Sequence, residues 1–359
     1  MKKGFTIIET SLVVAISGLL AVGLMIGWSR NINIQRYNDS VETFKSDIQA
    51  VFDEVQNPTN TRVKGRCLWK GADSVENVPD NLNGTERPVA FGIKEQNDHE
   101  VEIVHSLAKW KRYALGRYGF APGQGLYTDM NAIRRDEYTD NIHSIYVDQW
   151  DWERIIKPED RNEEYLKHIV QAIVNTICNV NHLLKARFPV LDTEIKREVT
   201  FVTAQELEDM YPGLTAEQRE YEFAKIHKTI FVMKIGDKLK SGVTHGHRAP
   251  DYDDWELNGD IIFWNEILQK EFEISSMGIR VNRNSIEEQL KKAGCEDRKE
   301  LPYHKMLLNG ELPDTIGGGI GQSRLCMLLI GTAHIGEVQA SLWNDETTRV
   351  CKDSGVLLL

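Results

Sequence analysis

The sequence predicts an α+β fold, in which an antiparallel sheet flanked by helices is preceded by an apolar helix at the N-terminus. Three observations predict this fold. Beyond about residue 71, several strand candidates follow one another without a helix between each pair, which favours an antiparallel sheet over a doubly wound parallel one. Residues 163–187 place apolar side chains at helical spacing. Residues 10–29 form an uncharged, mainly apolar run that the rest of the chain does not match.

The composition is that of a globular protein. Of the 359 residues, 41% are hydrophobic and 27% are charged, which excludes a wholly disordered or collagenous chain. The formal net charge is -11, and such an acidic chain is poorly suited to bind nucleic acid, because Lys and Arg dominate contacts to phosphate. The five cysteines show no CxxC spacing, so the sequence predicts reduced thiols rather than a disulfide framework or a zinc site.

The uncharged run Thr10–Ser29 has the length of a membrane-spanning helix. As a helix it would extend about 30 Å, the thickness of the hydrocarbon core of a bilayer. The preceding residues 2–9 (KKGFTIIE) resemble the prepilin leader of type IV pilins and pseudopilins. The resemblance covers about residues 1–55 and implies cleavage by a peptidase after Gly4. A buried core helix is the alternative interpretation of the apolar run.

A change in composition follows this segment and predicts a domain boundary. An amphipathic stretch at residues 39–55 could continue the apolar helix, and it ends before Pro58. Beyond about residue 71 the chain has the mixed helix and strand pattern of an enzyme. We therefore assign residues 1–66 to a leader, an apolar helix and its amphipathic extension, and residues 67–359 to a catalytic domain.

Periodicity and capping predict the elements of the second domain. Helical periodicity indicates one long helix at residues 163–187 and a short apolar helix at residues 325–330. Capping boxes, in which Ser or Thr is followed three residues later by Glu or Gln, predict helix starts at Thr203, Thr215 and Ser285. We expect strands at residues 101–104, 144–147, 198–202, 229–235, 260–264 and 274–281.

A glycine-rich run at residues 316–324 (IGGGIGQSR) is the first candidate for chemistry. We expect a turn that leads into the short apolar helix, and a helix N-terminus offers free N–H groups and a partial positive charge to a phosphate. Arg324 adds a fixed cation at this point. The run lacks the Lys-Ser/Thr pair of a P-loop, and a purely structural turn remains an equal alternative.

A second candidate combines two histidines with acidic residues. His245 and His247 precede the acidic residues of the segment 251–254, and this combination could bind a transition metal. The same segment could lie beside a magnesium nucleotide, with Arg248 contacting a phosphate. A solvated acidic loop is the third interpretation, although the aromatic residues among the acids argue against it.

Further polar side chains lie on predicted strands. Glu273 and Arg280, together with Asp260, could hold a hard cation and a carboxylate at separate points, unless they form an ordinary surface ion pair. Residues 144–151 alternate between polar and apolar, which predicts a half-buried strand that directs Asp and Gln side chains into one cleft. No order typical of a covalent nucleophile stands out. The abundance of arginine, acid and glycine-rich backbone favours phosphoryl or adenylyl chemistry.

Several long strings beyond residue 71 carry a resemblance to one family. They are DNL from Asp80, HSLAKWKR from His105, GLYTDMNAIR ending at Arg134, YVDQWDWER from Tyr146, RAPDYDDW from Arg248, LNGD ending at Asp260, SSMGIRV from Ser275 and TIGGGIGQSRL from Thr315. Residues 71–359 resemble the ammonia-dependent asparagine synthetases, that is, aspartate–ammonia ligases. This family has the class II aminoacyl-tRNA synthetase fold, and the resemblance places Arg134 and Arg324 at the arginines of the second and third class II motifs.

The resemblance implies an ATP-dependent ligase. L-aspartate and MgATP would form a β-aspartyl-adenylate and pyrophosphate, and ammonia would then displace AMP to give L-asparagine. Arg280 would bind the α-carboxylate of aspartate, and Asp80 or Asp253 could accept a proton from ammonium. The implied catalytic residues are Asp80, Lys111, Arg134 and Arg324, and the implied aspartate-binding residues are Asp80, Ser106, Lys111, Gln149, Asp151, Ser276 and Arg280.

The resemblance also implies ATP and Mg as cofactors and a homodimer as the assembly. In the family a helix and a strand before the position of Gly71 form the dimer interface, and here the leader-like segment takes their place. We expect a cytoplasmic catalytic domain, with membrane contact through residues 10–29. Two other hypotheses are a membrane-tethered pseudopilin-like structural protein with an inactive ligase domain, and a metal hydrolase that uses the two histidines. The implied nucleotide-binding residues are Arg134, Arg248, Asp253, Asp260, Glu273, Gly319, Gly321 and Arg324, of which Asp260 and Glu273 would hold Mg.

Overall fold

The computed structural model describes residues 68–69 and 87–359, which belong to one compact unit, Gly65–Leu359. The leader-like segment, the apolar run of residues 10–29 and the amphipathic stretch lie outside the described residues, as does Asp80. The domain boundary at residue 66 therefore stays a prediction. Of the helices that are described, none is long and apolar enough to cross a membrane.

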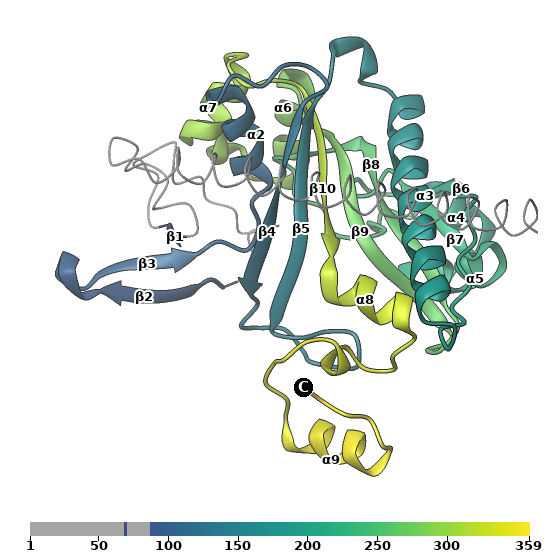
Figure 1. Ribbon diagram of the computed structural model, residues 1–359. Coiled ribbons are helices and arrows are strands. Elements are labelled where there is room, and N and C mark those ends of the chain that lie inside the picture. Colours follow the sequence, from purple (N-terminus) through teal and green to yellow (C-terminus); the bar gives the residue numbers. More distant parts are fainter. Residues whose placement is uncertain (1–67, 70–86) are drawn as a thin grey trace, which may run out of the picture. The chain divides into compact units, whose positions relative to one another are not determined.

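A seven-stranded sheet forms the centre of the described part (Figure 1). Its strands lie in the order β4, β5, β10, β9, β8, β7, β6, and every neighbouring pair is antiparallel except β6 and β7. The antiparallel prediction is therefore confirmed for all of the sheet but this edge. The strands are β4 (Gly125–Ile133), β5 (Tyr146–Ile155), β6 (Thr200–Thr203), β7 (Thr229–Met233), β8 (Asp253–Asn265), β9 (Lys270–Arg280) and β10 (Thr315–Gly321).

Helices cover both faces of this sheet. Successive side chains of a strand point to opposite sides, so neighbouring residues pack against different helices. On β7, Phe231 packs into the core cluster that contains residues of α3 and α8, whereas its neighbour Val232 packs with residues of α4 and α5. The helices are α2 (Ala108–Arg117), α3 (Glu163–Arg187), α4 (Ala204–Met210), α5 (Ala216–His227), α6 (Arg283–Ala293), α7 (Pro302–Leu308), α8 (Gln322–Ile330) and α9 (Asp345–Asp353).

The helix predictions from periodicity and capping are largely confirmed. The long helix α3 spans Glu163–Arg187, as the apolar spacing predicts. Capping boxes begin α4 at Thr203 and α5 at Thr215. The predicted start at Ser285 is wrong, because Asn282 caps α6 and its side chain accepts hydrogen bonds from backbone N–H groups of the first turn. Ser285 thus lies inside the first turn rather than before it.

The prediction of a turn at the glycine-rich run is wrong. Residues 315–321 form strand β10, which pairs with β5 on one side and β9 on the other. Its glycines are needed because the neighbouring strands approach closely. A Cβ atom on Gly318 would lie 2.6 Å from the Cβ of Met277, and one on Gly319 would lie 2.7 Å from Oε1 of Gln149. The expected helix does follow, as α8.

A smaller sheet precedes α2 in the chain. Its strands β1 (Leu68–Trp69), β2 (Val89–Ile93) and β3 (His99–Ile103) lie in the order β1, β3, β2, with antiparallel pairing throughout. Strand β3 confirms the prediction of a strand near residues 101–104. The segment between β3 and α2 contains residues of the site described next.

Candidate active site

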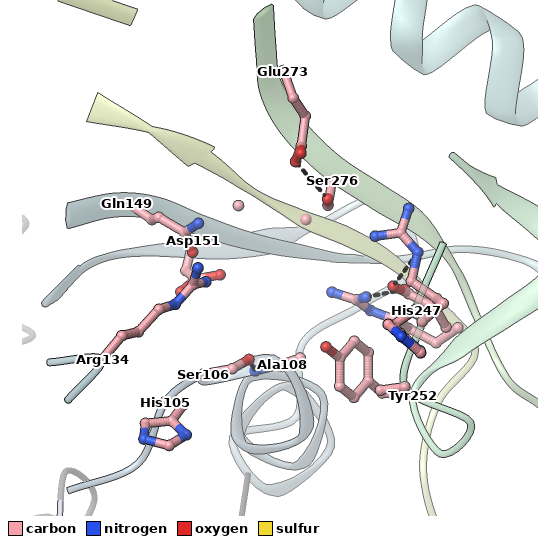
Figure 2. A pocket seen from close by; sticks show the side chains of 16 residues that line it. His105, Ser106, Ala108, Arg134, Gln149, Asp151, His247, Tyr252, Glu273 and Ser276 are labelled. Carbon is pink, nitrogen blue, oxygen red and sulfur yellow. Dashed lines mark hydrogen bonds and ion pairs between the residues drawn. The ribbon is translucent and has the colours of Figure 1, made fainter. Parts of the chain in front are cut away.

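Two adjoining cavities lie over the sheet where β5, β10 and β9 are neighbours. The first cavity has a volume of about 320 Å³ and is also walled by the start of α2 and by residues 247–253 (Figure 2). The second cavity has a volume of about 270 Å³ and extends toward α8 and residues 142–148. The residues that line both cavities are Arg134, Gln149, Glu273, Ser276 and Gly319.

A buried ion pair lies at the wall of the first cavity. Nζ of Lys111 donates to Oδ1 of Asp151 at 2.6 Å and to the carbonyl oxygen of Gly318 at 3.1 Å. The Lys111 side chain is completely buried. The other carboxylate oxygen of Asp151, Oδ2, is buried and has no hydrogen-bond partner among the described residues. Because Asp151 lines the cavity, this oxygen can accept a hydrogen bond from a bound N–H group.

Arg280, at the end of β9, is held by two buried carboxylates. Its Nε and Nη2 donate to Glu153 at 3.0 and 2.8 Å, and its Nη1 donates to Asp253. Burial by itself raises the pKa of Glu153, but the Arg280 guanidinium, with further contributions from Lys111 and Thr315, holds that pKa below its usual value. A Cβ atom on Gly317 would lie 1.9 Å from Oε2 of Glu153, so a side chain there would displace the pair.

Two arginines of the second cavity are only weakly paired. Nη1 of Arg134 lies 3.6 Å from the carboxylate of Glu137, and its Nε is buried without a hydrogen-bond partner in the described part of the chain. Nη1 of Arg324 donates to the carbonyl oxygen of Glu273 at 3.1 Å and lies 4.0 Å from its carboxylate. Both guanidinium groups therefore keep donors that an anion in this cavity can use.

The carboxylates of Asp260 on β8 and Glu273 on β9 lie close to each other. Nη2 of Arg248 donates to Oδ1 of Asp260 at 2.6 Å, and the hydroxyl of Ser276 donates to Glu273 at 2.9 Å. Burial raises the pKa of Asp260 to about 6, and the Arg248 guanidinium opposes this rise while the Glu273 carboxylate adds to it. Repulsion between the two carboxylates means that a cation beside them would be stabilised.

The structure brings most of the predicted site residues together. Lys111 lies buried beside the first cavity, Asp260 lies next to it, and Asp80 is outside the described residues. Two further predicted residues, Gly321 and Arg324, line the second cavity only. The predicted residues that line the first cavity are Ser106, Arg134, Gln149, Asp151, Arg248, Asp253, Glu273, Ser276, Arg280 and Gly319.

The two histidines of the hydrolase hypothesis do not share a site. His245 is buried and its Nε2 lies within hydrogen-bond distance of Oε1 of Glu220, at 2.8 Å, whereas His247 lines the first cavity. Across residues 68–69 and 87–359, no three His, Cys, Asp or Glu side chains are grouped so that they could hold a metal ion. The prediction of a His-based metal centre is therefore wrong for the described residues.

Glu153 is a site residue that the sequence reasoning missed. It follows Gln149 and Asp151 at intervals of two on β5, so all three side chains lie on the same face of the sheet. This period of two is the signal that could have found it. Tyr252, whose ring centroid lies 5.5 Å from the guanidinium carbon of Arg280, was also given no role. It lies in the loop before β8, where no periodicity marks it.

Comparison of the chain with known proteins gives consistent results. A model of the aspartate-ammonia ligase family matches residues 35–355. The aspartate–ammonia ligase of Clostridium tetani is 61% identical over 280 residues, which are 78% of this chain and 82% of that protein. The aspartate–ammonia ligase of Lactobacillus acidophilus is 60% identical over 288 residues, which are 80% of this chain and 86% of that protein.

Solved structures show a similar fold at low sequence identity. An asparaginyl-tRNA synthetase of Entamoeba histolytica, in complex with asparaginyl-adenylate, matches with a TM-score of 0.51 and 15% identity over 73% of this chain and 60% of that chain. An asparaginyl-tRNA synthetase of Pyrococcus horikoshii, also complexed with asparaginyl-adenylate, matches with a TM-score of 0.51 and 11% identity over 72% of this chain and 61% of that chain. These likenesses support the predicted class II synthetase fold of the sheet and its helices.

The family match begins at residue 35, earlier than residue 71, where the resemblance was expected to begin. It spans the residues that form both cavities, including those from β5, β9 and β10. With relatives at 60% identity or more over most of their length, the match shows that this chain belongs to the aspartate–ammonia ligase family.

Proposed function

We propose that this protein makes L-asparagine from L-aspartate, ammonia and ATP through a β-aspartyl-adenylate, and that it releases AMP and pyrophosphate. Curated relatives at 60 and 61% identity are named aspartate–ammonia ligases. The observation that carries the proposal is the pair of adjoining cavities, one with buried and paired charges and the other with two arginines that keep free donors. The pseudopilin-like alternative gains no support from the relatives.

The first cavity suits aspartate, which carries one ammonium and two carboxylate groups. The unpartnered Oδ2 of Asp151 would accept from the ammonium group, with the amide of Gln149 beside it. Arg280 would bind the α-carboxylate through guanidinium N–H groups that Glu153 and Asp253 leave unused, since the group has five donors. The β-carboxylate would then face the boundary between the two cavities.

The second cavity suits the phosphates of ATP. A carboxylate is a poor electrophile, and transfer of the adenylyl group to the β-carboxylate supplies a leaving group that ammonia can displace. Arg134 lines both cavities, so it would contact the phosphate at which the new bond forms. Arg324 would neutralise charge that develops on the pyrophosphate side. Asp253 or Asp80 would take the proton that ammonium must lose.

Asp260 and Glu273 would hold a magnesium ion. Magnesium binds proteins through one or two carboxylates together with substrate phosphates, and the raised pKa of Asp260 beside Glu273 fits such a place. A bound ion there would offset the negative charge of the phosphates. We expect activity to depend on Mg, and Glu273→Ala to lower it more than His245→Ala, because magnesium prefers oxygen to imidazole.

The test of the proposal is the stoichiometry of the reaction. Purified protein with aspartate, ammonium, ATP and Mg should yield asparagine and AMP in equal amounts, with no AMP in excess of background when aspartate is omitted. The Arg324→Ala variant is the control for a contaminating ligase. ADP in place of AMP, or asparagine formed equally well without the protein's own Arg324, would overturn the proposal.

We further propose that the catalytic domain is cytoplasmic and dimeric, and that residues 1–55 form a prepilin-like leader and helix with membrane contact through residues 10–29. The uncharged run of residues 10–29 supports the membrane contact. This run lies outside the described residues. The full chain should sediment with membranes, whereas a chain that begins near residue 67 should not. Release of the full chain by high salt alone would contradict membrane insertion, and a sedimentation coefficient for one subunit would contradict the dimer.

A further inference from the structure

Two lysines of α2 pair with buried aspartates on two different elements beside the first cavity. Lys111 pairs with Asp151 on β5, whereas Lys109 pairs with Asp251 in the loop before β8. Nζ of Lys109 lies 2.9 Å from Oδ2 of Asp251, and the two side chains are 3% and 0% exposed. Neither Lys109 nor Asp251 lines the cavity or takes part in the proposed reaction. The pair is a direct link between α2 and the loop.

The loop that contains Asp251 supplies one wall of the first cavity. Residues 247–249, 252 and 253 line the cavity, and Figure 2 shows Tyr252 and Ala108, the first residue of α2, facing the same space. The ring of Tyr252 lies beside two cations, with its centroid 5.5 Å from the guanidinium carbon of Arg280 and 6.0 Å from Nζ of Lys109. A shift of the loop relative to α2 would therefore move Tyr252 and disturb Arg280.

Asp251 has two other cationic partners on elements that lie outside the cavity wall. Nη1 of Arg298, in the 3-10 helix Glu296–Glu300, lies 2.9 Å from its Oδ2. Nε2 of His304, in α7, lies 3.0 Å from the same oxygen. No residue of either element lines the first cavity. Of these three contacts, the one with Lys109 connects the loop to α2, and the other two connect it to the body of the domain.

We propose that Lys109 and Asp251 are a positioning pair, which holds the two walls of the aspartate site at the separation that aspartate needs. The proposal rests on the proposed function. An ion pair removed from water has a strongly preferred geometry, and a displacement of about 1 Å in a binding site can cost up to roughly a hundredfold in rate. The second cavity, which the phosphates would occupy, is lined by neither α2 nor this loop, so the pair should affect the KM for aspartate more than the KM for ATP.

The test compares Lys109→Met with Arg298→Met in the full chain. Lys109→Met keeps the apolar stem and leaves Asp251 with Arg298 and His304, so the carboxylate stays compensated. It should raise the KM for aspartate roughly tenfold while the KM for ATP rises by about threefold or less. Arg298→Met is the matched control, because it removes a partner at the same 2.9 Å distance without breaking the link to α2. Both of its KM values should stay within about twofold of the parent.

The outcomes separate failure of the proposed function from failure of the positioning role. If the parent made no asparagine, the proposed function would be overturned, not the positioning role alone. If the parent were active and the two variants had the same aspartate KM, or if the ATP KM rose in step with it, the positioning role would be wrong. Should Lys109→Met not fold, Lys109→Arg keeps the charge with a different geometry. A raised aspartate KM in that variant supports the proposal, and parental values overturn it.

Discussion

The two cavities hold their charged side chains in opposite ways. Around the first, Lys111 and Asp151 are buried and paired at 2.6 Å, and Arg280 is paired with Glu153 at 2.8 Å. In the second, the Arg134 side chain is 34% exposed, and its nearest ion-pair contact is 3.6 Å long. The difference indicates two tasks. Fixed pairs give a small amino acid a rigid, preorganised site, whereas loosely paired arginines keep their charge for phosphates.

The largest effect should follow from breaking a pair at the first cavity. Asp151→Asn would leave the Lys111 charge buried without a carboxylate, so the free energy of unfolding should fall by about 3–5 kcal/mol. Urea denaturation of the variant and the parent measures this difference. A loss below about 1 kcal/mol would show that Lys111 finds another partner or becomes neutral, and would remove the distinction between the cavities.

Arg324→Ala tests the second cavity, where the effect should be on catalysis and not on folding. Loss of a preorganised charge should cost about 2–4 kcal/mol of transition-state stabilisation in adenylate formation. The side chain is 23% exposed and its contact with the Glu273 carboxylate is 4.0 Å long, so the unfolding curve should stay near that of the parent. Aspartate-dependent exchange between ATP and labelled pyrophosphate measures the step. Exchange at the parent rate would contradict a phosphate role for this arginine.

The carboxylate of Asp260, next to the first cavity, should make the need for Mg depend on pH. Because burial raises the pKa of Asp260 to about 6, its charged form is disfavoured by folding when no cation is bound. The contribution of Asp260 to stability is thus full below about pH 4 and is lost as pH rises through about 6. Magnesium needs the charged form, so the Mg concentration for half-maximal activity should rise between pH 7.5 and 5.5. Asp260→Asn should abolish this dependence, and an unchanged Mg requirement in the parent would contradict it.

The smallest effect should come from Glu137→Gln in the second cavity. The Glu137 carboxylate lies 3.6 Å from Arg134 and is partly exposed, and such pairs contribute about 1 kcal/mol or less to stability. Urea denaturation of Glu137→Gln and Asp151→Asn under the same conditions compares their two losses of unfolding free energy directly. A loss as large as that of Asp151→Asn would mean that the second cavity is as preorganised as the first.

Prediction from sequence succeeded where the signal is local. Helix α3 was found at its full length because an amphipathic helix shows its period within one segment. Strand β10 was mistaken for a turn because four of its residues are glycines, which carry no side chains to show a period of two. Its strand state depends on pairing with β5 and β9, which lie far away in the chain. Strand β4 was not expected, and β5 was predicted too short.

The sequence by itself determined most of the chemical groups that the site contains. Motif strings identified Gln149, Asp151, Arg280 and Arg324, and the structure places them around two adjoining cavities. The tertiary structure alone decided how these groups are held. Glu153 fixes Arg280 across 127 positions of sequence separation, and Lys109 reaches Asp251 from another element. Such pairings depend on burial and on distances between strands and helices, and neither quantity is written in the local order of residues.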